Sequence, residues 1–97
     1  MLMLVTYDVN VTTRAGEKRL RHIAKICLDH GVRVQNSVFE CEVDPAQWVQ
    51  FKAELLRIYD STQDSLRFYA LGKRGVDKVE HCGVKPTFNP LHSTLIL

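Results

Sequence analysis

The stretch VRVQNSVFECEVDPAQ, residues 32–47, decides the fold class of this chain. Apolar and polar side chains alternate on both sides of Asn36-Ser37, which is the period of two expected for half-buried strands. Residues 32–43 are therefore predicted to form either two strands joined by a tight hairpin at Asn36-Ser37 or one long strand kinked there. Asp44-Pro45-Ala46-Gln47 then predicts a helix start, with an acidic N-cap, proline at the first position and a capping-box glutamine.

The segments on either side complete a recognisable order of elements. An apolar strand is predicted over residues 3–8, a helix over about 15–30 that ends at Gly31, and strands over 66–71 and 76–84. The first helix has the apolar stripe Leu20, Ile23, Ala24, Cys27 and Leu28, and the second has Trp48, Phe51, Leu55, Ile58 and Tyr59. The order β-α-β-β-α-β, with an additional C-terminal strand or two, predicts an α+β ferredoxin-like sandwich in which two helices cover one face of an antiparallel sheet.

Length and composition indicate one small domain over residues 1–97, of which 84–97 form a C-terminal tail. The apolar opening residues 1–5 are too few for a signal-peptide core or a membrane span, so no membrane association is expected. The three scattered cysteines, Cys27, Cys41 and Cys82, contain no C-x-x-C pair, which argues against a disulfide framework or a structural zinc site. A cytoplasmic location is expected.

The charge is unevenly distributed although the net value is only +2. Arg14, Lys18, Arg21 and Lys25 are spaced four, three and four residues apart, so they share one face of the first predicted helix. This basic stripe is a candidate contact for a nucleic-acid backbone. The alternative, which the sequence supports equally, is that these charges only keep the outer face of the helix in water. Lys73, Arg74 and Lys78 would extend the same field or form an ordinary charged loop.

Asp8 is the strongest candidate for chemistry, because it ends an apolar strand directly after Tyr7, where a loop opens. The alternative is a turn-forming aspartate, which position alone favours. One carboxylate by itself makes a poor Mg²⁺ site, because Mg²⁺ requires an octahedral set of oxygen ligands. This set usually consists of one or two carboxylates together with phosphate oxygens. A two-fold dimer would present Asp8 twice and supply the second carboxylate.

Four segments together resemble the second core CRISPR-associated protein family, the Cas-two family of small metal-dependent nucleases. They are Val5-Thr6-Tyr7-Asp8, the basic helix segment 19–25, the run from Arg33 to Glu40, and residues 60–72. The Gln-x-Ser-Val-Phe-Glu core within residues 35–40 is the most specific of them.

The resemblance implies a ferredoxin-like homodimer with Asp8 as the metal ligand and catalytic carboxylate. It implies cleavage of double-stranded DNA or single-stranded RNA, with Mg²⁺ or alternatively Mn²⁺, and a bridging role for the CRISPR integrase in spacer acquisition. Tyr7, Arg33 and Phe39 match positions tied to the site, with Ser37 close by. Ser37 and Phe39 thus join the basic stripe as candidate nucleic-acid-binding residues, although strand alternation favours a core position for Phe39. Arg14 and Arg21 do not align one to one with the family's basic residues.

The mechanism that follows from the resemblance is metal-assisted hydrolysis of a phosphodiester bond. Asp8 from both copies would hold Mg²⁺, Arg33 would stabilise the scissile phosphate, and Tyr7 would position Asp8 or the substrate. One alternative is a non-catalytic homodimeric DNA-binding scaffold that bridges integrase dimers. Another is an amino-acid-sensing domain of the same fold, which would require a glycine-rich ligand pocket that the chain does not show.

The apolar residues Thr94-Leu95-Ile96-Leu97 end the tail, where a chain normally frays into water. We predict that the tail crosses the dimer axis and adds a strand to the partner's sheet, because exposed sheet edges tend to be paired. The alternatives are that the tail folds back on its own protomer or docks on the integrase.

Overall fold

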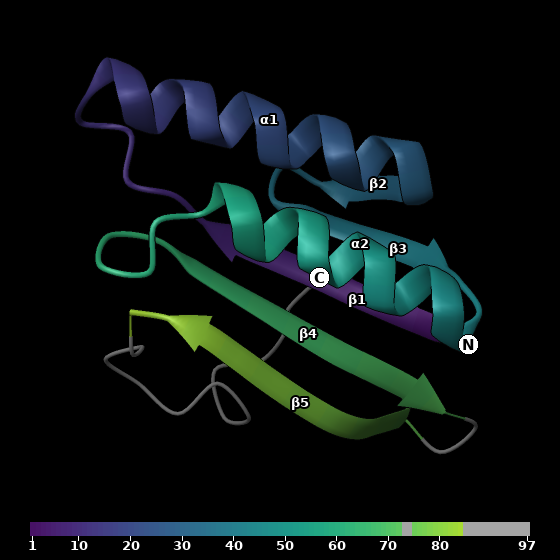
Figure 1. Ribbon diagram of the computed structural model, residues 1–97. Coiled ribbons are helices and arrows are strands. Elements are labelled where there is room, and N and C mark those ends of the chain that lie inside the picture. Colours follow the sequence, from purple (N-terminus) through teal and green to yellow (C-terminus); the bar gives the residue numbers. More distant parts are fainter. Residues whose placement is uncertain (73–74, 85–97) are drawn as a thin grey trace.

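The described part of the chain forms two helices and a five-stranded antiparallel sheet, which confirms the predicted α+β ferredoxin-like class (Figure 1). The computed structural model describes residues 1–72 and 75–84. Its elements are β1 (Leu2–Asp8), α1 (Arg14–His30), β2 (Val32–Gln35), β3 (Val38–Glu42), α2 (Pro45–Ile58), β4 (Ser65–Gly72) and β5 (Gly75–Gly83). The strands lie in the order β2-β3-β1-β4-β5, so β1 is central and β5 extends the sheet beyond β4.

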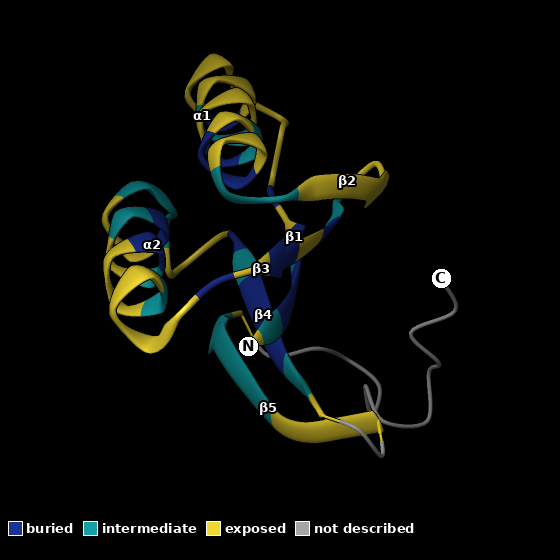
Figure 2. Cartoon of the chain, turned by 90° about the vertical axis from the view of Figure 1, so that its right-hand side faces the viewer, coloured by how far each residue is buried: buried dark blue, intermediate teal, exposed yellow. Residues whose placement is uncertain are grey.

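Both helices pack on the same face of the sheet, as the view in Figure 2 shows. Strand alternation explains which residues meet them: Met3, Val5 and Tyr7 of β1 join the buried core cluster. Leu4, Thr6 and Asp8 must then point to the opposite face, which α1 and α2 do not cover. We call this opposite side, which carries no helix, the open face, although Leu4 on it is only 1% exposed.

The start of α2 follows the capping chemistry predicted from the sequence. The Asp44 carboxylate accepts a 2.7 Å hydrogen bond from the Gln47 N–H, and the Gln47 side chain accepts a 2.9 Å bond from the Asp44 N–H. Thr13 caps α1 in the same way, because its hydroxyl accepts a 3.1 Å bond from the Gly16 N–H. Gly31 follows α1 as expected, and an added Cβ there would lie 2.3 Å from the Glu40 carbonyl oxygen.

The structure decides one open alternative and corrects two predictions. Residues 32–43 form a hairpin, with β2 and β3 separated at Asn36-Ser37. Leu28 was predicted to be buried but is 53% exposed, whereas Ile26 is 6% exposed. At about 100° per residue, Leu28 lies roughly 140° around α1 from the buried Ile23, and Ile26 only about 60°. The expected short strand at 76–84 is the nine-residue β5.

Several predictions concern residues outside the described part of the chain. Lys73 and Arg74, and the strand-like end at residues 94–97, belong to this group. The exchange of the tail between two copies therefore stays a prediction. Within residues 1–72 and 75–84, no helix is both long and apolar enough to cross a membrane.

Candidate active site

Asp8 lies at the end of the central strand on the open face. The register partner of Asp8 is Ser65, the first residue of β4. The Asp8 side chain is exposed. Among residues 1–72 and 75–84, no ion pair includes the Asp8 carboxylate. The sequence-predicted ligand is therefore an accessible carboxylate that no cation in the described part of the chain neutralises.

Tyr7 points into the core and ties β1 to the hairpin turn. Its side chain is 6% exposed, its hydroxyl donates a 3.3 Å hydrogen bond to the Asn36 carbonyl, and its backbone N–H donates a 3.2 Å bond to the Ser37 carbonyl. Burial raises the pKa of Tyr7 above its usual 10.0, and the nearby Cys27 adds to the rise while Arg33 opposes it. Tyr7 is therefore a neutral phenol that positions the strand end carrying Asp8.

Phe39 is fully buried, with 0% exposure, and this corrects its prediction as a nucleic-acid contact. Its ring stacks on Tyr7 with centroids 6.1 Å apart, inside the helix-covered core. A ring without exposed area has no face on which a base could stack. Phe39 instead supports Arg33, whose guanidinium carbon lies 5.1 Å from the ring centroid.

Arg33 and Asp8 do not share a face of the sheet. Arg33 pairs with Phe39 in the β2–β3 ladder, and paired residues of an antiparallel ladder point to the same side. Arg33 therefore lies on the helix-covered side at the edge strand β2, whereas Asp8 lies on the open face. The structure does not bring the two residues together within one chain, as the interpretation of Arg33 as the partner of Asp8 would require.

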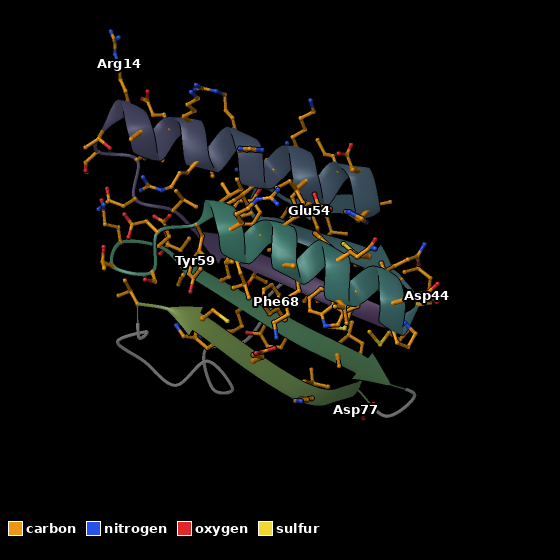
Figure 3. The ribbon with its side chains drawn as sticks, viewed as in Figure 1. Arg14, Asp44, Glu54, Tyr59, Phe68 and Asp77 are labelled. Carbon is orange, nitrogen blue, oxygen red and sulfur yellow. The ribbon has the colours of Figure 1, made fainter. Side chains whose placement is uncertain are left out.

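The basic stripe of α1 is exposed along its whole length, with Arg14, Lys18, Arg21 and Lys25 at the surface. Arg14 points away from the sheet in Figure 3. The stripe is centred about 180° around the helix from the buried Ile23, so it faces outward on the helix side of the molecule. Asp8 and the stripe thus belong to different surfaces of one protomer.

A buried carboxylate, Asp64, organises the loops beside the end of β1, and the sequence analysis missed it. Asp64 is 0% exposed and accepts hydrogen bonds from the backbone N–H groups of Asn10 (3.0 Å) and Asp60 (2.9 Å) and from Arg19 (2.8 and 3.3 Å). Burial acts to raise the pKa of Asp64, but the Arg19 bond and the two backbone bonds outweigh it, so the pKa is lowered.

These contacts join the β1–α1 loop, helix α1 and the turn before β4 around one acid. In the sequence, Asp64 ends a run of polar residues that is typical of a solvated turn. A buried acid needs a cationic partner, and the sequence signal for that partner was Arg19. Because Arg19 and Asp64 are 45 residues apart, the sequence does not show that they pair.

Comparison with known proteins identifies the family. Residues 1–79 match the family described as "CRISPR associated protein Cas2". The chain belongs to the Cas2 family. It is 58% identical to the CRISPR-associated endoribonuclease Cas2 of Chlorobaculum tepidum, over 100% of both chains. It is 52% identical to the CRISPR-associated endonuclease Cas2 of Halalkalibacterium halodurans, over 92% of this chain and 93% of the relative.

Solved structures give the same family and fold. The crystal structure of Streptococcus pyogenes Cas2 at pH 6.5 superimposes with a TM-score of 0.71 at 63% sequence identity, covering 75% of this chain and 88% of the other. A hypothetical protein, TT1823 from Thermus thermophilus, superimposes with a TM-score of 0.65 at 33% identity over 88% of this chain and 93% of the other. The resemblance inferred from the sequence motifs is thereby confirmed.

The single Asp8 carboxylate is a weak donor set for a hard divalent cation, and a second Cas2 chain would add a second carboxylate. No group of three or more His, Cys, Asp or Glu side chains in the described residues is arranged to hold a metal ion. An accessible carboxylate oxygen is nevertheless a donor that Mg²⁺ prefers, and Mg²⁺ takes its remaining ligands from water and phosphate. Two copies of Asp8 with a phosphodiester would give such a set.

Proposed function

We propose that this Cas2-family chain is a CRISPR-associated, Mg²⁺-dependent endonuclease that acts on phosphodiester bonds as a homodimer. The observation that carries the proposal is the exposed Asp8 carboxylate at the end of the central strand, which no cation in the described residues neutralises. The names of relatives support nuclease chemistry, one being an endoribonuclease and another an endonuclease. RNA and DNA are both proposed substrates.

The chain's own residues hold and orient the site. Asp8 from each copy would hold the cation, and Tyr7 would fix the strand end because its backbone and hydroxyl both bond to the hairpin turn. Bound Mg²⁺ would supply Lewis-acid chemistry, which lowers the pKa of a bound water and neutralises charge on a phosphate. Arg33, at the outer edge of the sheet, would contact the backbone of the same nucleic acid away from the cleaved bond.

Metal removal tests this proposal directly. Dialysis against EDTA should abolish cleavage of a 5′-labelled single-stranded RNA and of a DNA duplex of the same sequence, and added Mg²⁺ or Mn²⁺ should restore it. Cleavage is followed on denaturing gels, and Zn²⁺ serves as a control ion with different ligand preferences. Cleavage that continues at the same rate in EDTA would contradict the metal-dependent mechanism.

A different observation favours a second function. In this function the protein is a DNA-binding scaffold that bridges CRISPR integrase dimers during spacer acquisition. The basic stripe of α1 faces away from the sheet side that holds Asp8, so nucleic acid could bind there without approaching the carboxylate. Duplex binding that persists in a preparation without any nuclease activity would support the scaffold over the enzyme.

The stripe itself gives a prediction for binding. Lys18→Ala and Lys25→Ala should each weaken binding of duplex DNA equally for all sequences. Each lost phosphate contact should reduce the slope of log K against log salt by about 0.9. Fluorescence anisotropy at several salt concentrations measures the slope, and Arg57→Ala on α2 is the matched control with one charge removed elsewhere. Unchanged slopes in both lysine variants would mean that the DNA binds another surface.

A further inference from the structure

A second polar residue shares the open face with Asp8, next to it on the neighbouring strand. In the β1–β4 ladder Thr6 pairs with Arg67 and Asp8 pairs with Ser65. Arg67 and Asp8 are therefore diagonal neighbours on one face, a relation that separates residues by about 7–8 Å and lies within reach of a long side chain. The alternation that separates Arg33 from Asp8 places Arg67 on the same face as Asp8.

In the part of the chain that the structure describes, the Arg67 guanidinium is held by a histidine of β5 and not by an acid. Arg67 is 9% exposed, and its Nη2 lies 2.7 Å from Nδ1 of His81, its register partner. His81 Nε2 lies 2.6 Å from the Val84 carbonyl oxygen, which only accepts, so Nε2 carries the ring proton and Nδ1 accepts from Arg67. His81 thus acts as a neutral support that fixes the direction of the guanidinium.

The charge of Arg67 stays uncompensated within residues 1–72 and 75–84. The ion pairs found there join other groups: the N-terminus with Glu42, Arg19 with Asp64, His30 with Glu54, and Lys52 with Glu80. A guanidinium has five N–H donors, and His81 takes only one of them. Within the described residues, a largely buried cation with spare donors and a carboxylate without a counter-ion lie on one face of the sheet. This arrangement suits a ligand that carries an anion and brings a divalent cation.

We propose that Arg67, positioned by His81, binds the phosphate on which Asp8 acts. This inference rests on the nuclease function proposed above and assigns the role that the sequence analysis gave to Arg33. The guanidinium fork matches two phosphate oxygens, and its low exposure strengthens the attraction because water screens it less. His81 is a positioning residue, and the ligand class is a nucleic-acid phosphodiester.

Binding without cleavage is the first test. In the Asp8→Asn background, which keeps the nucleic acid intact, Arg67→Gln should raise the Kd for a fluorescent single-stranded RNA about tenfold. It should also lower the salt slope by about 0.7, the value for one lost contact to a single strand. Arg57→Gln, an exposed arginine on α2, is the control. A change in Kd no larger than in the control would overturn the proposal.

Kinetics separate a phosphate contact from a purely structural role. With Asp8 present, Arg67→Gln should lower kcat/KM at least tenfold. Arg67→Lys should restore part of the lost kcat/KM, because lysine returns the positive charge but not the forked pair of N–H donors. His81→Leu should lower kcat/KM as well, and the double variant should lose little more than Arg67→Gln alone. If Arg67→Lys is as inactive as Arg67→Gln and both melt at lower temperature, Arg67 is structural and the inference is wrong.

The two proposals fail in different ways. Full cleavage by Asp8→Asn would end the proposed nuclease function whatever Arg67 does. Loss of cleavage in Asp8→Asn together with normal binding and cleavage by Arg67→Gln would overturn the inference about Arg67 alone.

Discussion

Asp8→Asn should abolish Mg²⁺-dependent cleavage and leave the fold intact. The amide has almost the same shape, but it removes the negative charge that attracts the cation, and in a dimer both charges would disappear together. Loss of even an outer-shell partner typically costs about 10–100-fold in metal affinity or activity, so loss of the direct ligand should exceed 100-fold. Initial rates on labelled RNA and DNA at saturating Mg²⁺ measure the effect.

The fold control for this variant is thermal melting by circular dichroism together with sedimentation. Asp8 is exposed and has no ion pair in the described residues, so its replacement should change the free energy of unfolding by less than about 0.5 kcal/mol. Asp29→Asn, at an exposed acid near the end of α1, should retain full activity. Equal rates for Asp8→Asn and the native chain would assign the activity to another residue or to a contaminant.

Asp64→Ala should cause the largest loss of stability among substitutions of charged residues. It removes the acceptor of four hydrogen bonds and leaves the Arg19 guanidinium, 15% exposed at its side chain, without its anion. Breaking a buried ion pair on one side typically costs about 3–5 kcal/mol, a large part of the roughly 5–15 kcal/mol that stabilises a domain. Urea unfolding followed by circular dichroism measures the change.

The pH dependence of unfolding separates the charge of Asp64 from its packing. Its pKa is lowered in the folded chain, so its stabilisation is present above the unfolded value near 3.8 and is lost as the pH falls through the folded value. The native chain should lose stability below about pH 4 more steeply than Asp64→Asn, which has no charge to lose. Asp29→Ala should match the native profile, and identical acid profiles for all three would contradict the account.

The sequence by itself determined the order of the elements and the accessible carboxylate. The apolar run in residues 3–8, the alternation in residues 38–43 and the helical stripes can be predicted because each depends on neighbours a few residues away. The capping box of Asp44 and Gln47 is equally local, and the structure contains it as predicted. The motifs around Asp8 and residues 35–40 identified the family, since a motif needs no knowledge of distance in space.

Only the tertiary structure decided which residues share a surface with Asp8. A single step along a strand moves a side chain to the other face, so the register of the sheet decides which residues meet. The pairing of Arg67 with Thr6 depends on strands far apart in sequence, and its pairing with His81 depends on the register of the consecutive strands β4 and β5. The same long-range pairing buried Phe39 and separated Arg33 from Asp8. It also enclosed Asp64, because burial of a charged group depends on its donors, and Asn10 and Arg19 bring theirs from far away in the sequence.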